Sequence, residues 1–342
     1  MKSIVDYNQF LPWKNNLGAS AVEVGPDDRS GMVYLHDPNL QLAAEIAIVT
    51  QRPLLIRGQP GSGKSSFAPF VARNLNWRYY ETTITGRTEA KDLLWKFDAL
   101  ARLRDAQAKS DIDPRRYVTP GVMWWAFNRE NAIDFISQRK SLPKGKVAVR
   151  DNEDEPLAEI NYKRDPFRAV VLIDEIDKAD PELPNDLLEV LGLNRFRIDE
   201  LDLLIERKTL EPDPRKNSPN HFGGLLIIIT TNQERDLPDA FVRRCVVHII
   251  EEPEDENKQI ERLTEIAKLH MSTLIESHHD GEKLVCKVAR THYKLRQEAK
   301  KRRLGREPST AEFLDALKVC FRLEIDPESE LWHQVEQNVF IK

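Results

Sequence analysis

Five short runs of mostly apolar residues occur along the chain, and their apolar positions are continuous rather than alternating. They are Pro53–Ile56, Arg78–Thr85, Ala169–Glu175, Leu225–Asn232 and Cys245–Ile250. Strands that are covered on both faces of a sheet show this pattern. Because helical patterns separate the runs, the sequence predicts an α/β fold with a doubly wound parallel sheet and helices on both faces. Its ligand site is expected beyond the carboxyl ends of the strands.

The periodicity changes along the chain and predicts the domain organisation. Residues 1–36 form a polar N-terminal segment, after which Asp37 is expected to cap a helix that leads to the first strand. An α/β domain is expected over residues 37–252. After the acidic stretch Glu251–Glu256 the pattern becomes purely helical, which predicts a small all-α domain over residues 253–342.

Two intervals between the predicted strands are longer than such connections need. The interval between the second and third strands contains an ordered insertion at about residues 86–125, in which Trp124 and Trp125 suit a buried helix face. The interval between the third and fourth strands contains a predicted hairpin at about residues 195–222.

Composition narrows the class of protein. The chain has 342 residues, of which 40% are hydrophobic and 31% charged, and its formal net charge is -5, as in a mildly acidic globular protein. No apolar run reaches the roughly 18 residues that cross a bilayer, and no hydrophobic signal core begins the chain, so we expect no membrane insertion and a cytoplasmic location. The acidic balance does not favour a nucleic-acid partner. The basic run Lys300–Arg306 is expected to be a solvated helix end, and Cys245, Cys286 and Cys320 to be packing residues.

A glycine-rich loop follows the first apolar run and carries the strongest chemical signal in the sequence. It fits the pattern G-x-x-x-x-G-K-[ST] with Gly58, Gln59, Pro60, Gly61, Ser62, Gly63, Lys64 and Ser65, and Ser66 follows in a predicted helix. The glycines let backbone N–H groups converge on phosphate oxygens, Lys64 brings a positive charge to the β and γ positions, and the hydroxyl of Ser65 can bind Mg²⁺. The loop predicts binding of a nucleoside triphosphate with Mg²⁺.

Polar residues at the ends of later runs indicate that the bound triphosphate is hydrolysed. Asp174 can hold Mg²⁺, partly through water, and Glu175 can orient and deprotonate the attacking water. Asn232 can hydrogen-bond this water and a γ-phosphate oxygen. Arg243 and Arg244, which follow a short predicted helix, are candidates to stabilise charge in the site of a neighbouring subunit.

Four segments in this order, GQPGSGKS, VVLIDEID, TTN and LPDAFVRRC, followed by a helical domain, resemble the AAA+ ATPases over nearly the whole chain. The tracts TGRTEAKDLLWKFDALARLRDAQ and YVTPGVMWWAF make the chain similar to MoxR-like ATPases of the dynein-related branch. The resemblance implies a P-loop NTPase fold with a helix-2 insertion, a hairpin before the sensor strand and a C-terminal lid. It also implies ATP as substrate, Lys64 as a catalytic contact, Asn232 as the sensor, and Arg244 rather than Arg243 as the finger supplied in trans.

The same resemblance implies a homo-oligomer in the form of a hexameric ring and chaperone-like work on a protein client. It also implies a partner with a von Willebrand factor A domain. One position departs from the family pattern: Ala311 in EPSTAEF stands where relatives often carry a lid arginine. Either Arg306 or another residue replaces that arginine, or lid closure is coupled to the nucleotide less tightly.

Three functions compete on this sequence. The favoured one is a ring-forming, Mg²⁺-dependent ATPase that remodels, loads or activates a partner protein. The second is a nucleic-acid-associated or restriction-type motor, and the third is a nucleotide-binding switch with negligible turnover. The motifs identify the triphosphate part of the nucleotide and do not distinguish adenine from guanine. Contacts to the base would come from the lid and from the N-terminal segment near Val33–Leu35.

Overall fold

The computed structural model describes the chain in six stretches, which are residues 29–108, 113–142, 155–208, 224–302, 307–327 and 329–340. They belong to two compact units. The first contains Asn39–Arg57 and Val71–His248, and the second contains residues 29–38, Gly58–Phe70 and the chain from Ile249 onward. The predicted domain limits at residues 36 and 252 stay predictions.

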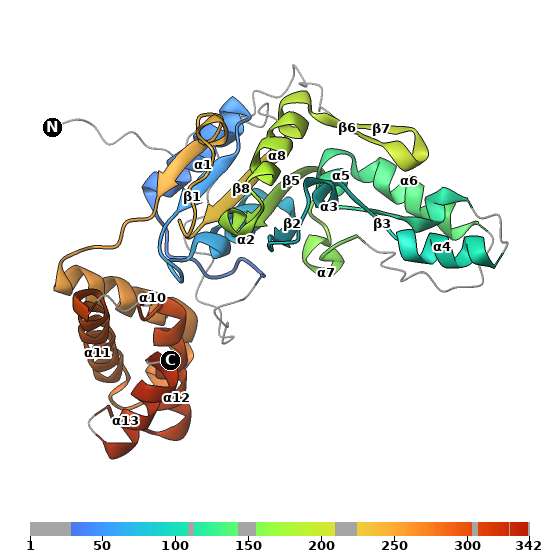
Figure 1. The fold of residues 1–342 in the computed structure, drawn as a ribbon. Helices are drawn as coiled ribbons and strands as arrows, with labels where there is room; N and C mark the ends of the chain where they lie inside the picture. Colours follow the sequence, from blue (N-terminus) through green and yellow to red (C-terminus); the bar gives the residue numbers. More distant parts are fainter. Residues whose placement is uncertain are drawn as a thin grey trace, which may run out of the picture. The chain divides into compact units, whose positions relative to one another are not determined.

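A five-stranded sheet in the order β2-β5-β8-β1-β9 forms the centre of the first unit (Figure 1). Its strands are β1 (Leu54–Arg57), β2 (Trp77–Thr83), β5 (Asp165–Asp174), β8 (Leu225–Thr231) and β9 (Val246–Ile249). β2 pairs with β5, β5 with β8, and β8 with β1, all in parallel. The predicted class, an α/β fold with a parallel sheet, is confirmed, and the carboxyl ends of β1, β5 and β8 lie at one edge of the sheet.

Both faces of the central strands are buried, which explains why their apolar runs are continuous. Val170, Val171, Leu172 and Ile173 are all at most 1% exposed although successive side chains point to opposite faces. The helices between the strands include α2 (Lys64–Leu75), α8 (Glu182–Leu193) and α9 (Asp239–Val242), and α1 (Pro38–Thr50) precedes β1. The start of α1 at Pro38 confirms the predicted helix.

The edge strand β2 is covered by a side chain rather than by a further strand. Asn161, at the end of α7 (Ala158–Asn161), accepts a hydrogen bond from the N–H of Tyr79 at 2.7 Å and donates to the carbonyl of Tyr79 at 3.0 Å. Asn161 is fully buried. Its amide therefore satisfies backbone groups that an open sheet edge would leave unpaired.

The predicted insertion after β2 folds into short elements. They are α3 (Ala90–Leu94), β3 (Trp95–Phe97), α4 (Ala99–Gln107), the 3₁₀ turn η2 (Pro114–Tyr117), β4 (Val118–Pro120), α5 (Val122–Phe127) and α6 (Arg129–Lys140). β3 and β4 pair in antiparallel. Trp124 is 0% exposed and Trp125 is 3% exposed, which confirms that they pack in a core. Helix α5 places them against β2 and β5.

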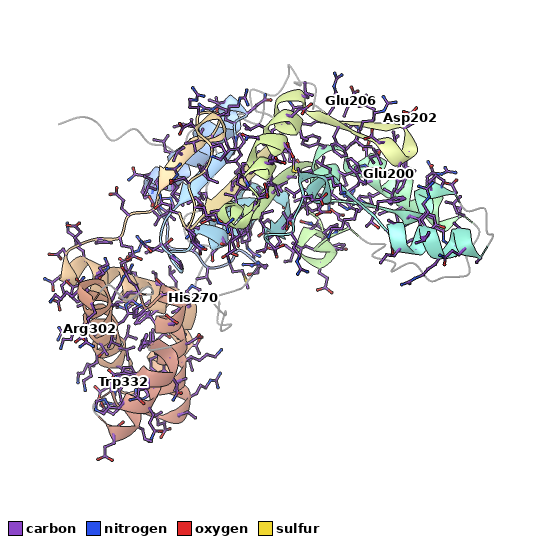
Figure 2. The ribbon with its side chains drawn as sticks, in the orientation of Figure 1. Glu200, Asp202, Glu206, His270, Arg302 and Trp332 are labelled. Carbon is purple, nitrogen blue, oxygen red and sulfur yellow. The ribbon has the colours of Figure 1, made fainter. Side chains whose placement is uncertain are left out.

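A hairpin precedes β8, as predicted. β6 (Arg195–Ile198) and β7 (Leu203–Glu206) pair in antiparallel, and the rest of the predicted tract, residues 209–222, lies outside the described residues. Figure 2 shows Glu200, Asp202 and Glu206 along this hairpin. The indole N–H of Trp95 donates to Glu200 at 3.1 Å, and the Trp95 ring stacks on Phe196. These contacts attach the hairpin to the insertion.

Helices form the C-terminal part of the second unit. They are α10 (Glu256–Ser277), α11 (Gly281–Arg302), α12 (Thr310–Leu323) and α13 (Glu330–Val335), with a π-helical turn at Glu336–Phe340. Phe313, Leu317 and Trp332, the last labelled in Figure 2, lie in their shared core. No described helix combines the length and apolar character needed to cross a bilayer. Cys245 and Cys320 are buried, as predicted for packing residues.

A histidine is buried in this helical core. His292 is 2% exposed and lies against the rings of Phe313 and Phe340, and its Nε2 is 3.2 Å from the carbonyl oxygen of Ser309. Burial, with a smaller effect of Arg296, lowers the pKa of His292 to about 4. The imidazole is therefore neutral in the folded protein at neutral pH.

We predict that this histidine makes the helical part sensitive to acid. Between about pH 6.5 and pH 4 the unfolded chain binds a proton at residue 292 and the folded chain does not, so the free energy of unfolding falls by about 3 kcal/mol as the pH is lowered through this range. Urea unfolding of the wild type and of His292→Asn at pH 7 and pH 4.5 measures this pH-dependent loss in the free energy of unfolding. The wild type should lose more stability than the variant, while His279→Asn, at a side chain 96% exposed, should behave like the wild type. Equal losses in all three proteins would contradict the prediction.

Candidate functional site

The predicted phosphate loop joins β1 to α2. β1 ends at Arg57, the loop begins at Gly58, and α2 begins at Lys64, so that Ser65 and Ser66 lie in its first turn. Pro69 lies in the second turn, as the sequence predicted. A helix of this length directs the N–H groups and the positive end of its dipole toward the loop.

Two glycines of the loop have a backbone conformation that other residues rarely adopt. Gly61 has a φ of 76° and Gly63 a φ of 89°. Space is also limited at Gly61, because a Cβ there would lie 2.6 Å from the Cβ of Ser309. The loop therefore needs glycine at position 61 for two separate reasons.

The side chain of Lys64 bends back onto the glycine loop that precedes it. Its ammonium group donates to the carbonyl oxygens of Gly58 and Gln59, both at 2.8 Å, and the residue is only 6% exposed. A buried ammonium is costly unless it is hydrogen-bonded, and these carbonyls compensate part of that cost. The positive charge is thereby held within the loop.

The N-terminal segment and the first turns of α2 pack together within the second unit. The ring of Tyr34 lies 5.4 Å from that of Phe67 and 5.1 Å from that of Phe70. A Cβ on Gly63 would lie 3.6 Å from the Tyr34 ring, and burial raises the pKa of the Tyr34 hydroxyl. Tyr34 belongs to the segment Val33–Leu35 that was expected to contact a base, and that role stays a prediction.

The start of α12 lies against the loop in the same unit. Ser309 caps α12 through a capping box with Glu312, and it is the residue that a side chain at Gly61 would meet. Ala311 is the second residue of α12, two residues after Ser309, and its methyl side chain carries no charge. Arg306, the suggested replacement for a lid arginine, lies outside the described residues.

The acidic residues of the candidate site lie where β5 ends. Asp174 is the last residue of β5, and Glu175 follows with φ 60° and ψ 48°, in the left-handed region. The hydroxyl of Thr230 donates to a carboxylate oxygen of Asp174, and it accepts from the backbone N–H of Glu175 at 3.0 Å. One side chain on β8 thus orients both acidic residues.

Asn232 is brought to Glu175, as strand order predicted. Its side-chain amide donates to Glu175 Oε1 at 3.4 Å, a long hydrogen bond. The carboxylate of Asp177, which is 3% exposed, accepts from the backbone N–H groups of Asn232 and Glu234 at 3.1 and 3.0 Å. Asp177 therefore fixes the backbone turn from which Asn232 extends.

Lys178 contacts the other oxygen of Glu175. Residues Ile176–Lys178 form a 3₁₀ turn, which returns the Lys178 side chain to Glu175, and its ammonium donates to Oε2 at 2.6 Å. This hydrogen bond raises the pKa of Lys178. Sequence reasoning identified Glu175 and Asn232 but missed Thr230, Asp177 and Lys178. For Lys178, the available signal was its spacing of three residues from Glu175.

The two arginines lie at the opposite edge of the sheet from Glu175. Arg243 and Arg244 directly follow α9 and are exposed, and the guanidinium of Arg52 donates to the carbonyl oxygens of Arg243, Arg244 and Cys245 at 2.5, 3.1 and 2.7 Å. Arg52 precedes β1, and Glu175 lies at the carboxyl edge, so the structure does not place the arginines beside Glu175. They line an open cavity of about 750 Å³.

Fold and site together define a class of protein. A glycine loop with a lysine at the start of the following helix, and a carboxylate pair at the tip of a parallel strand in the same chain, are the elements of P-loop nucleoside triphosphatases. Residues 53–245 match the family model described as AAA domain (dynein-related subfamily), and the chain belongs to this family. It is therefore an AAA+ ATPase by family, and ATP hydrolysis is the general activity of such proteins.

Among solved structures, the chain matches the RuvB Holliday junction branch migration motor of Thermotoga maritima. It is 14% identical, with a TM-score of 0.40, and the match covers 88% of this chain and 67% of RuvB. A mutant of the same RuvB is 14% identical, with a TM-score of 0.43 and coverage of 89% and 70%. No curated protein matches the sequence.

We predict that Gly61→Ala damages the loop. The variant should lose about 1–3 kcal/mol of stability, because the added methyl is strained at this φ and meets Ser309, and it should bind ATP at least tenfold more weakly. Thermal unfolding and titration with a fluorescent ATP analogue measure the two effects. Gly192→Ala is the matched control, since a Cβ there meets nothing within 4 Å. A Gly61→Ala protein as stable and as tightly binding as Gly192→Ala would refute this description of the loop.

Proposed function

We propose that this protein is a Mg²⁺-dependent ATPase of MoxR-like type that works in a ring and remodels, loads or activates a partner protein. The observation that carries the proposal is the hydrogen-bonded group of Asp174, Glu175, Thr230 and Asn232 at one edge of the sheet. It combines a carboxylate that can bind a metal, a second carboxylate that can accept a proton, and a neutral amide. These are the groups that hydrolysis of a phosphoanhydride requires.

The residues proposed for Mg²⁺ fit its chemistry. Ser65 and Asp174 offer hydroxyl and carboxylate oxygens, the donors that Mg²⁺ prefers, and a few protein oxygens suffice when phosphates and water complete the shell. The bound ion would neutralise negative charge on the β- and γ-phosphates. Ser65, in the first turn of α2, and Asp174, at the end of β5, would hold it, the latter partly through water.

The proposed reaction transfers the γ-phosphoryl group to water. A bond forms between the water oxygen and the γ-phosphorus, and the bond from that phosphorus to the β–γ bridging oxygen breaks, with its electron pair left on ADP. Glu175 accepts the water proton, and Asn232 orients the water through its amide. Lys64 stabilises the charge that develops on the phosphoryl oxygens.

The ring is proposed from the position of the arginines together with the sequence resemblance. Arg243 and Arg244 lie at the edge of the sheet away from Glu175, and Arg52 fixes their backbone there. A guanidinium presented in this way can serve the site of a neighbouring copy. Hexamer formation, a protein client and a partner with a von Willebrand factor A domain are supported by the resemblance to MoxR-like ATPases.

A nucleic-acid motor is the alternative, and charge does not favour it. The chain carries a net charge of -5, whereas binding to phosphate backbones depends on clustered basic side chains. Stimulation of ATP hydrolysis by DNA or RNA, with an effect that declines as salt rises, would favour this alternative over a protein client.

We predict that Glu175→Gln binds ATP but loses turnover. The amide keeps the size of the side chain and cannot accept the water proton, so the rate of phosphate release should fall about 10²- to 10⁴-fold while ATP affinity stays within a few-fold of the wild type. Glu206→Gln, the same change at a glutamate 63% exposed on the β6–β7 hairpin, is the control and should be fully active. Equal turnover by wild type and Glu175→Gln would exclude Glu175 as the base.

We also predict that Arg244 acts on a neighbouring copy. Arg244→Ala and Glu175→Gln should each be nearly inactive alone. When mixed, they should recover part of the wild-type rate, because an intact Glu175 in one subunit then meets an intact Arg244 from the next. Phosphate release is measured across mixing ratios at constant total protein. A mixture no more active than its parts, or a fully active Arg244→Ala, would count against an arginine supplied in trans.

A further inference from the structure

Glu175, the proposed base, has contacts at both carboxylate oxygens. Oε2 accepts from the ammonium of Lys178 at 2.6 Å, and Oε1 accepts the longer hydrogen bond from Asn232 at 3.4 Å. The bond from Lys178 joins two opposite charges and is the shorter of the two, whereas Asn232 is a neutral donor at a distance near the limit of a hydrogen bond. Lys178 therefore has the larger influence on where this carboxylate points.

The backbone around this ion pair is held by hydrogen bonds, and its side chains are partly exposed. Glu175 N–H is bonded to Thr230, and the N–H of Lys178 donates to the carbonyl oxygen of Glu175 at 3.0 Å. The side chains of Lys178 and Glu175 remain 41% and 29% exposed. Opening the pair needs only rotation of these two side chains, with the 3₁₀ turn left in place.

The ammonium group of Lys178 hinders the Glu175 carboxylate from acting as a base. A general base must offer an oxygen lone pair to the attacking water within hydrogen-bond distance. Lys178 occupies a lone-pair site on one such oxygen, Oε2. A water molecule that approaches Oε2 from the direction of Lys178 has to displace the ammonium group.

We propose that Lys178 holds Glu175 in a resting position, and that hydrolysis proceeds when this ion pair opens. Lys178 is then a positioning residue that limits the rate of turnover. The inference rests on the proposed role of Glu175 as the base. It adds to that role a brake on turnover, namely the contact of Lys178 with Glu175 in the same site.

The test is the rate of ATP hydrolysis by Lys178→Met, which keeps the length of the side chain and removes its charge. We expect kcat to rise roughly two- to five-fold, since a partly exposed ion pair constrains its partners by about this factor, with KM for ATP unchanged. Lys178→Arg keeps the pair and should stay near the wild-type rate. Lys91→Met removes a lysine that pairs with Glu89 at 2.9 Å elsewhere on the surface, and it should change nothing.

A rise in kcat cannot come from loss of structure, which only lowers activity, and thermal unfolding of each variant verifies that it is folded. Unchanged or reduced kcat in both Lys178→Met and Lys178→Gln would overturn the proposal. So would acceleration that persists in the double variant Lys178→Met/Glu175→Gln, because the brake must act through Glu175. Failure of the proposed function gives a different result, namely wild-type turnover in Glu175→Gln itself.

Discussion

The hydroxyl of Thr230 is the contact on which the acidic half of the site depends. Parallel pairing sets Ile173 of β5 beside Ile229 of β8, so the next residues along the two strands, Asp174 and Thr230, meet at the sheet edge. A hydroxyl can donate and accept at once, and Thr230 donates to Asp174 and accepts from the N–H of Glu175. A left-handed residue other than glycine costs roughly 1–3 kcal/mol, which these hydrogen bonds help to offset. The register of β5 and β8 thereby determines how the acidic residues at this edge are oriented.

A steric constraint has the corresponding role in the phosphate loop. The backbone at Gly61 has a positive φ and passes so close to Ser309 that no side chain fits between them. Ser309 caps α12, and its carbonyl oxygen also lies at 3.2 Å from the ring of His292. The loop, the first turn of α12 and the core of the helical part are therefore linked by contacts within one unit. A change of loop conformation must be accommodated by the start of α12.

The sequence predicted the parts of this protein that depend on burial and on spacing along the chain. The strands were predictable because residues such as Val171 are covered on both faces, and the glycine loop because its spacing is rigid. Contacts that depend on strand register or on a local turn were not. Asn161 pairs with Tyr79 across 82 residues of sequence, and Thr230 was hidden inside an apolar run. Lys178 reaches Glu175 only because the residues directly after Glu175, Ile176–Lys178, form a 3₁₀ turn.

The sheet separates the acids from the arginines. β1 has its register partners from Ile228 to Thr231 on β8, so its amino end, next to Arg52, and its carboxyl end, at Arg57, mark opposite edges. Four residues at about 3.3 Å each give roughly 13 Å between these edges. The guanidinium of Arg52 ties the segment after α9 to the first edge through three carbonyl groups, and the N–H of Val246 donates to Pro53 beside it. The proposed action of Arg244 on a neighbouring copy depends on this separation, because each copy would then present a guanidinium group that its own carboxyl edge lacks.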